Sequence, residues 1–239
     1  MQIKIPSRAR PLLQRVGEIA DAQGLSVYAV GGCVRDWSRG ITSVKDLDIT
    51  VEGDGIALAG LLAQRLGGTV TAHAAFGTAT LRLPGGKGRL DVASCRKEIY
   101  KRPAAYPTVS AGTLEDDLFR RDFTVNAMAL ALNPGRFGTL IDPFQGAKDL
   151  RGKRLRILHE RSFLDDPSRI LRGVRFAQRF GLRWDSRTRR AALDALTAQA
   201  LSWLNAGRLR REMERMLEEP DPRACLSQLG ALLEASRTR

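Results

Sequence analysis

The chain is poor in cysteine and histidine, and it lacks a long apolar run. Its 239 residues include three cysteines, which are far apart and show no CxxC spacing. That spacing argues against both a disulfide framework and a zinc site. No run of about 18 apolar residues exists, so no membrane span is expected, and the first residues lack the apolar stretch of a signal peptide. A cytoplasmic protein is therefore expected.

Acidic residues are also scarce relative to basic ones. There are 39 Lys and Arg against 26 Asp and Glu, a formal net charge of +13. Residues 151–239 alone hold 20 basic and 11 acidic residues. A polyanion such as nucleic acid is the natural partner of such a chain. Because 32 of the 39 basic residues are Arg, genome composition explains the excess equally well on this observation alone.

The apolar pattern predicts an α+β fold class in two domains. Residues 1–145 form a mixed β/α domain and residues 146–239 a helical, basic domain. Helices are expected at 8–23, 33–39, 56–66, 166–180 and 206–219, and strands at 25–30, 46–53 and in three short runs between 68 and 94. The proline-containing segment 100–113 is interpreted as a loop, and from about residue 114 the pattern is almost wholly helical.

Two carboxylates are separated by one residue on a β-prone run. Asp46 and Asp48 would face the same side of a strand, where their repulsion calls for a neutralising cation. A divalent cation that prefers oxygen, such as Mg²⁺, is suited to that task. Asp91 lies on another β-prone run, which would place a third carboxylate on an adjacent strand. Solvent-facing acids on an edge strand are the alternative.

A pair of glycines precedes these acids. Gly31 and Gly32 follow a predicted strand and precede a short helix, a geometry that lets backbone N–H groups approach an anion. Arg35 lies about one turn into that helix and could donate a fork of hydrogen bonds to phosphate oxygens. A tight turn followed by a surface arginine explains the same residues.

The stretch "GGCVRD…KDLDI" resembles motif A of the nucleotidyltransferase superfamily that includes DNA polymerase β. It is most similar to the branch of class II tRNA nucleotidyltransferases and bacterial poly(A) polymerases. The resemblance implies a polymerase-β-like head, with a mixed or antiparallel sheet flanked by helices, followed by an all-helical neck. It also implies that Asp46 and Asp48 bind the metal and activate an RNA 3′-hydroxyl. Asp91 would be a third catalytic carboxylate, and Gly31, Gly32 and Arg35 would bind the nucleotide.

A second segment, "RRDFTVNA", resembles motif B of the same family. By that resemblance Arg121 and Asp122 recognise the ribose of the incoming nucleotide. Taken from the residues alone, the segment is a solvated charge run before a short helix that includes Val125, Met128 and Leu130.

Residues 165–182, "DDPSRILRGVRFAQRFGL", carry polar side chains three apart. Asp166, Arg169, Arg172 and Arg175 would share one half of a helix, whose start suits Asp166 as N-cap and Pro167 in the first turn. An ordinary helix surface with salt bridges is the alternative explanation of these four polar residues. The segment also resembles the family's motif D. That resemblance implies that Asp166 and Arg169 read the base edge, and that Arg172 and Arg175 reach the nucleotide.

The resemblance spans roughly residues 25–230 and implies a function. The expected enzyme is metal-dependent, uses Mg²⁺, and adds C and/or A from CTP and ATP to the 3′ end of tRNA, releasing pyrophosphate. The segment 103–116 matches a loop used for adding A, which disfavours a CC-only enzyme. Body and tail domains typical of the family are expected to be absent. A poly(A) polymerase, a non-catalytic RNA-binding relic and a small-molecule nucleotidyltransferase are the alternatives.

Overall fold

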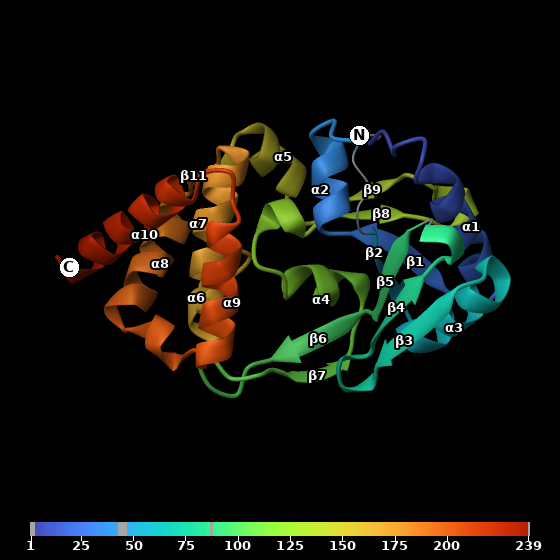
Figure 1. Cartoon of the computed structure of the whole chain (residues 1–239), viewed down its shortest axis with the longest axis horizontal. Helices are drawn as coiled ribbons and strands as arrows, with labels where there is room; N and C mark the ends of the chain where they lie inside the picture. Colours follow the sequence, from blue (N-terminus) through green and yellow to red (C-terminus); the bar gives the residue numbers. More distant parts are fainter. Residues whose placement is uncertain (1–2, 43–46, 87, 239) are drawn as a thin grey trace. The chain divides into compact units, whose positions relative to one another are not determined.

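A computed structural model of the chain describes residues 3–42, 47–86 and 88–238 (Figure 1). The chain forms two compact units that interleave in sequence. Unit 1 comprises Met1–Glu98, Val109–Arg121 and Asn126–Ala147, and unit 2 comprises Ile99–Thr108, Asp122–Val125 and Lys148–Arg239. None of the helices in the described ranges has the length and apolar character needed to cross a bilayer.

Unit 1 is built on one mixed sheet. Its described strands are β1 (Ser26–Val30), β2 (Leu47–Glu52), β3 (Thr69–His73), β4 (Thr78–Arg82), β5 (Arg89–Ser94), β8 (Ala129–Ala131) and β9 (Leu140–Ile141), in the order β3-β4-β5-β2-β1-β8-β9 (Figure 1). The pair β2–β5 is parallel, whereas the other described pairs of this sheet are antiparallel. The expected mixed sheet is therefore confirmed.

Helices α1 (Arg10–Asp21) and α3 (Gly55–Leu66) pack against this sheet and against each other (Figure 1). Apolar residues recur at helical spacing along both and are buried, as the sequence predicts. The start of α3 is fixed by Asp54, whose carboxylate accepts hydrogen bonds from the N–H groups of Ile56 and Ala57. The helix ends at the expected glycine, Gly67.

Two shorter helices of unit 1 flank the sequence motifs. Helix α2 (Gly32–Ser38) follows β1 directly, and α4 (Leu114–Phe119) precedes the "RRDFTVNA" segment. Thr113 caps α4 by accepting a hydrogen bond from the N–H of Asp116, whose side chain returns a bond to the Thr113 N–H. Short 3-10 turns complete the unit at Ala74–Phe76, Pro84–Gly86 and Pro134–Arg136.

The expectation of an almost wholly helical chain after residue 114 is wrong. Strands β8 and β9 join the main sheet, and the expected short helix through Val125, Met128 and Leu130 does not form. Helix α4 ends at Phe119, and Thr124–Asn126 is a 3-10 turn. Ala127 to Leu132 are all buried, so neither a period of 2 nor one of 3.6 distinguishes strand from helix there. Pairing with β1 decides the outcome.

The interpretation of 100–113 as a loop is also wrong in part. Strand β7 (Thr108–Ala111) pairs with β6 (Arg96–Ile99) in a separate two-stranded sheet. All four residues of β7 are exposed, so the strand has no buried face and leaves no alternating apolar signal in the sequence.

Unit 2 is mainly helical, as expected for the C-terminal region. Its helices are α6 (Ser162–Asp165), α7 (Ser168–Phe180), α8 (Ser186–Thr197), α9 (Ala206–Leu217) and α10 (Pro222–Arg237), and α5 (Gly146–Arg151) leads into it (Figure 1). A 3-10 turn lies at Ala200–Trp203, and the short parallel strands β10 (Arg154–Leu155) and β11 (Arg183–Trp184) pair beside the helices.

An aromatic cluster forms part of the core of unit 2. The rings of Phe123 and Phe163 lie 6.3 Å apart, and those of Phe123 and Phe176 meet edge to face at 6.1 Å. Apolar residues of α7, α8 and α10 pack into the same core. Residues 122–125 thus belong to unit 2 because Phe123 is buried in that core.

Candidate active site

Asp48 on β2 and Asp91 on β5 are direct neighbours in the sheet. The parallel register pairs Asp48 with Asp91, Leu47 with Leu90 and Ile49 with Val92. The apolar residues of both strands are buried, whereas Asp48 is exposed and Asp91 is partly exposed. The two carboxylates therefore share one face, which confirms the predicted adjacency. Asp46 lies outside the described residues.

The Asp91 carboxylate already has a cationic partner. It accepts hydrogen bonds from Thr80 Oγ1 at 2.6 Å and from Arg89 Nε at 3.1 Å and Nη2 at 2.6 Å. Both members of the ion pair are accessible, with side-chain exposures of 47% for Arg89 and 27% for Asp91. A metal ion at Asp91 would therefore compete with Arg89.

The carboxylates of Asp48 and Asp91 are the kind of ligand that a divalent cation with a preference for oxygen binds. Asp48 and Asp91 supply carboxylate oxygens only, which suits Mg²⁺ rather than zinc. Across the parts of the chain that the structure describes, no group of three His, Cys, Asp or Glu is placed to hold a metal. A further ligand is needed, and Asp46 is two residues before Asp48 in sequence.

The turn between β1 and α2 requires glycine at position 31. Gly31 has φ +71° and ψ −128°, a conformation that L side chains rarely adopt. A Cβ there would lie 2.8 Å from Arg121 Nη1 and 3.8 Å from Asp48 Oδ2. The turn, the Arg121 guanidinium and the Asp48 carboxylate thus come together in unit 1, whereas the sequence analysis placed Arg35 beside the glycines.

Arg121 is held by a buried carboxylate that the sequence analysis did not single out. Asp117 is fully buried and accepts hydrogen bonds from Arg121 Nη2 at 2.8 Å and Arg120 Nη2 at 2.6 Å. Burial alone would raise the pKa of Asp117, but the charges of Arg121 and Arg120 outweigh it and hold that pKa below its usual value. The sequence did carry one signal for this ion pair, because Asp117 and Arg121 are four residues apart, the spacing at which side chains meet on a helix.

The Nε atom of Arg121 remains available to a ligand. It is buried and has no hydrogen-bond partner among the described residues. Buried donors are normally satisfied, so an unused guanidinium N–H beside Gly31 and Asp48 is consistent with a site that binds an anion or a hydroxyl.

Arg35 is less available than the sequence suggested. It is 8% exposed, and Nε and Nη2 donate to the two oxygens of Asp36 at 2.9 and 3.1 Å. Nη1 donates to Asn126 Oδ1 at 2.7 Å. The fork expected to face phosphate is occupied by Asp36, so contact between Arg35 and a nucleotide stays a prediction.

Cys33, next to the glycine turn, is not a nucleophile. Burial and the neighbouring charge of Asp48 raise the pKa of the Cys33 thiol to about 12. The thiol is therefore neutral at physiological pH and donates to the Val30 carbonyl at 3.2 Å.

In unit 2, Asp122 pairs with Arg172. Asp122 Oδ2 accepts from Arg172 Nε at 2.9 Å and Nη2 at 2.6 Å, while Oδ1 accepts from the Phe123 N–H at 2.8 Å. The charge of Asp122 raises the pKa of Arg172, whose guanidinium also lies 5.2 Å from the centre of the Phe176 ring. The structure thus joins residues that the sequence assigned to two separate motifs.

Asp166 does not cap α7 as expected, because the N-cap is Pro167 and the helix begins at Ser168. Its Oδ1 nevertheless accepts from the Ser168 N–H at 3.0 Å and Oγ at 2.5 Å. The same oxygen accepts from Arg208 Nη2 at 2.6 Å. Arg208 was not among the residues singled out from the sequence.

Arg169 and Arg175 do not form a solvated stripe on α7. They are 5% and 7% exposed. Arg169 donates to Ser162 Oγ at 2.8 Å. Arg175 donates to Glu212 Oε2 and to Glu219 Oε1, each at 3.0 Å, which ties α7 to α9 and to the residues after it. Whether either arginine reaches a nucleotide stays a prediction.

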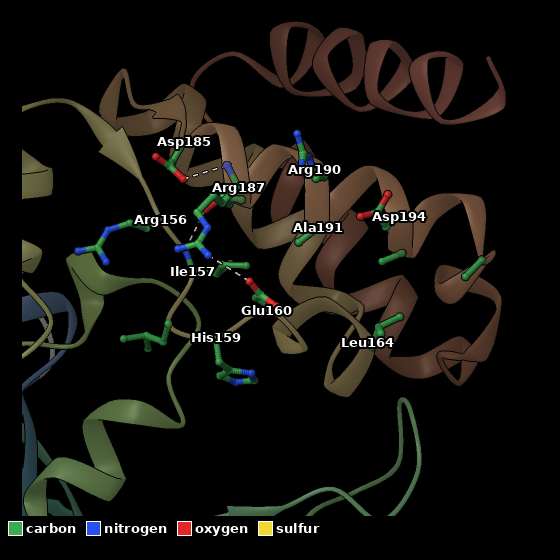
Figure 2. Close-up of a pocket in the computed structure, with 14 residues that line it drawn as sticks. Arg156, Ile157, His159, Glu160, Leu164, Asp185, Arg187, Arg190, Ala191 and Asp194 are labelled. Atoms are coloured by element: carbon green, nitrogen blue, oxygen red, sulfur yellow. Dashed lines mark hydrogen bonds and ion pairs between the residues drawn. The ribbon is translucent and has the colours of Figure 1, made fainter. Parts of the chain in front are cut away.

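A pocket of about 580 Å³ in unit 2 involves none of the predicted site residues. It is lined by residues of the segment before α6, such as His159 and Glu160, and by residues of α8, such as Arg190 and Asp194 (Figure 2). Arg187 donates to Glu160 at 3.4 Å across it, and both are 84% exposed. Burial and the charge of Arg169 lower the pKa of His159, so that imidazole is neutral at pH 7.

Comparison with known families identifies the group to which these motifs belong. The profile of the family described as "Poly A polymerase head domain" matches residues 27–156, more than half of the chain. The chain belongs to this head-domain family. The match includes β2, β5 and all of β1 except Ser26, together with the glycine turn and the arginines that precede Phe123.

Relatives of this head-domain protein act on tRNA. It is 43% identical over 224 residues to the A-adding tRNA nucleotidyltransferase of Halalkalibacterium halodurans, with 92% of this chain and 52% of the relative covered. It is 40% identical over 193 residues to the CC-adding tRNA nucleotidyltransferase of Deinococcus radiodurans, with 81% and 50% covered. The structure of a CCA-adding enzyme in an apo form matches with a TM-score of 0.91 at 41% identity, with 95% and 53% covered.

These comparisons confirm the family resemblance and the α+β head fold. The chain spans about half the length of each of the three proteins. Nucleotidyltransferases generally depend on a divalent metal ion, which agrees with the carboxylates at Asp48 and Asp91.

Proposed function

We propose that the chain is a template-independent tRNA nucleotidyltransferase. It adds A and/or C to the tRNA 3′ end from ATP and CTP and releases pyrophosphate, and it works in the cytoplasm. The observation that carries the proposal is the alignment of Asp48 with Asp91 beside the Gly31 turn and Arg121. Carboxylates that can hold a metal ion, a glycine turn that exposes backbone donors and a guanidinium that can neutralise phosphate charge all suit the transfer of a nucleotidyl group.

In this proposal Asp46 and Asp48 hold Mg²⁺, with Asp91 as the neighbouring catalytic carboxylate. When bound, the metal lowers the pKa of the terminal RNA hydroxyl and neutralises the triphosphate. The sheet register keeps Asp48 and Asp91 side by side, and the Arg89 pair holds Asp91 in one orientation. The buried hydrophobic neighbours Leu47 and Ile49 anchor the strand.

Gly31, Gly32, Arg35 and Arg121 bind the phosphates and ribose in unit 1. The positive φ of Gly31 lets the backbone turn sharply between β1 and α2. The absence of a Cβ at this position leaves room for Arg121 Nη1. Asp117 orients Arg121 by accepting from Nη2, which keeps Nε free of other acceptors among the described residues.

Asp122, Asp166, Arg169, Arg172 and Arg175 select the nucleotide in unit 2. Arg172 fixes the Asp122 carboxylate through two hydrogen bonds, which orients it toward a ribose hydroxyl. A carboxylate accepts hydrogen bonds and a guanidinium donates them, so Asp166 and Arg169 can complement the edges of adenine or cytosine.

Addition of A is favoured over addition of C. The A-adding relative is 43% identical over 224 residues, whereas the CC-adding relative is 40% identical over 193. The basic excess of residues 151–239 suits the phosphates of the tRNA acceptor arm. Binding to tRNA should therefore weaken steeply as salt is raised.

The test is incorporation of labelled ATP or CTP in Mg²⁺ on three tRNAs: one that lacks CCA, one that ends in CC and one that is complete. Addition of a single A to the CC-ending tRNA is expected. Extension of any RNA by many A residues would instead indicate a poly(A) polymerase. Binding of tRNA without incorporation of either nucleotide would indicate a non-catalytic relic and overturn the proposal.

A further inference from the structure

The Asp166 carboxylate is bonded asymmetrically. All three hydrogen bonds that the structure describes for it end on Oδ1, from the Ser168 N–H, Ser168 Oγ and Arg208 Nη2. The side chain of Asp166 is 20% exposed, so the carboxylate is still accessible. Three donors on one oxygen fix the plane of the carboxylate and direct Oδ2 away from them.

Arg208 is the donor that comes from another helix. It lies near the start of α9, where its own N–H donates to the N-cap residue Asn205. Its side chain is 16% exposed, in contrast to Arg210, which is 81% exposed and pairs with Glu214 on its own helix. A mostly buried ion pair between α9 and Asp166, which lies two residues before α7, is more than a surface contact.

Arg208 is in turn held by the segment Ile99–Thr108. Its Nη1 donates to the Ala104 carbonyl at 3.2 Å, and its guanidinium lies 5.6 Å from the centre of the Tyr106 ring. Ala104 adopts φ +55°, which is uncommon for a residue with a side chain, and its N–H donates to the Leu164 carbonyl at 3.1 Å. The guanidinium is therefore fixed by contacts on several sides.

We propose that Arg208 is a positioning residue for base selection, acting through Asp166. The inference rests on the proposed function, in which Asp166 reads the base. By occupying Oδ1, Arg208 leaves Oδ2 to accept a hydrogen bond from an exocyclic amino group, which adenine and cytosine carry on the edge where hypoxanthine and uracil carry a carbonyl oxygen. A carbonyl oxygen facing Oδ2 would leave two acceptors opposed, which disfavours those bases.

The experiment compares the wild-type chain with Arg208→Gln, Arg208→Lys and the matched control Arg210→Gln. Equilibrium dissociation constants are measured for ATP, CTP, UTP and ITP, the inosine nucleotide, and thermal unfolding reports folding. ATP against ITP and CTP against UTP each exchange an amino group for a carbonyl. The wild type and Arg210→Gln should prefer the amino-bearing member of each pair.

Arg208→Gln should lose about tenfold of that preference by weakening ATP and CTP, because a misdirected charged hydrogen bond costs roughly this factor. UTP and ITP, bound through ribose and phosphates, should change little. Arg208→Lys keeps a positive charge for Asp166 but lacks the planar fork whose two nitrogens reach Asp166 and the Ala104 carbonyl, so it should show an intermediate preference.

A folded Arg208→Gln or Arg208→Lys variant with the wild-type preference would overturn the role of Arg208. So would an equal loss of affinity for all four nucleotides, which indicates a packing role. If Arg208→Gln does not fold, the Lys variant decides by the same criterion. A wild-type chain that binds no nucleotide, or shows no preference within the pairs, would instead refute the proposed function, and the inference with it.

Discussion

Asp48 and Asp91 occupy the same register position on two parallel strands, and the residues before and after each of them are buried. Backbone pairing therefore holds the two Cα positions side by side and directs both side chains to the same face of the sheet. Because that pairing is part of the core of unit 1, a change confined to one carboxyl group should alter chemistry without altering the fold.

Asp48 holds the metal in the proposed function, so Asp48→Asn should lower nucleotide incorporation by about a thousandfold through the loss of several kcal/mol of charge stabilisation. Binding of tRNA, measured separately by filter retention, should be unchanged. Asp54→Asn is the control: it removes the same charge, but Asn caps the start of α3 as well as Asp does. An equal loss of incorporation and tRNA binding in Asp48→Asn would point to misfolding or to a wrongly assigned role.

Gly31→Ala should destabilise the chain by about 1–3 kcal/mol, because alanine at φ +71° is strained. It should also lower activity, since the new Cβ would lie 2.8 Å from Arg121 Nη1. Gly60→Ala in α3 is the matched control. A Cβ there meets nothing within 4 Å, so a gain of about 0.5–1 kcal/mol is expected. Urea unfolding of both variants measures the difference, and equal effects would contradict the argument.

Asp166→Ala should reduce the preference of the chain for ATP and CTP, because in the proposed function this carboxylate is the acceptor that faces the base edge. The proposed ribose and phosphate contacts are made by other residues, so weak binding of all nucleotides should persist. Competition between labelled ATP and unlabelled ITP measures the preference. Unchanged discrimination would refute Asp166 as the residue that reads the base.

Arg175→Met should cost about 1–3 kcal/mol in the free energy of unfolding, because Glu212 and Glu219 lose their shared buried cation. The loss is limited because Glu212 keeps its ion pair with Arg215 and Glu219 keeps its ion pair with Arg179. The exposed Arg210→Gln, which breaks a surface pair within α9, should change stability by less than about 0.5 kcal/mol. Denaturant titration of both variants and the wild-type chain measures these differences in the free energy of unfolding. A loss of nucleotide affinity without a loss of stability would show that Arg175 serves the nucleotide rather than the packing of unit 2.

The three thiols should react slowly with a disulfide reagent at pH 8 in the folded chain and promptly in denaturant. Burial raises the pKa of all three, to about 12 for Cys33 and about 11 for Cys95. The folded state disfavours the thiolate forms, so the buried neutral thiols contribute fully to the free energy of unfolding below pH about 9, the pKa of a thiol in the unfolded chain. That contribution should decline as the pH rises from about 9 toward 11 or 12, because the unfolded chain then ionises first. Rapid labelling of the folded chain at pH 8 would contradict the assigned burial.

Local patterns in the sequence were sufficient to predict the helices and strands of the first 94 residues, but not the order of the strands in the sheet. Strand alternation around Asp48 and Asp91, and the helical period of α1 and α3, are short-range signals that burial of one face imposes. The glycine pair before α2 predicted a tight turn because only glycine adopts such dihedral angles readily. The family resemblance of the three motifs could likewise be seen without coordinates.

Tertiary structure decided what local pattern cannot contain. Strand β8 exists because β1 pairs with it, although its residues are buried throughout and show no period. Asp122 pairs with Arg172, and Asp166 with Arg208, across 50 and 42 residues of sequence. Arg175 is buried because two glutamates close over it. The sequence by itself determined which carboxylates and guanidinia are present, and the packing of the helices in unit 2 and the strands in unit 1 decided which of them meet, because hydrogen bonds depend on distances in space rather than along the chain.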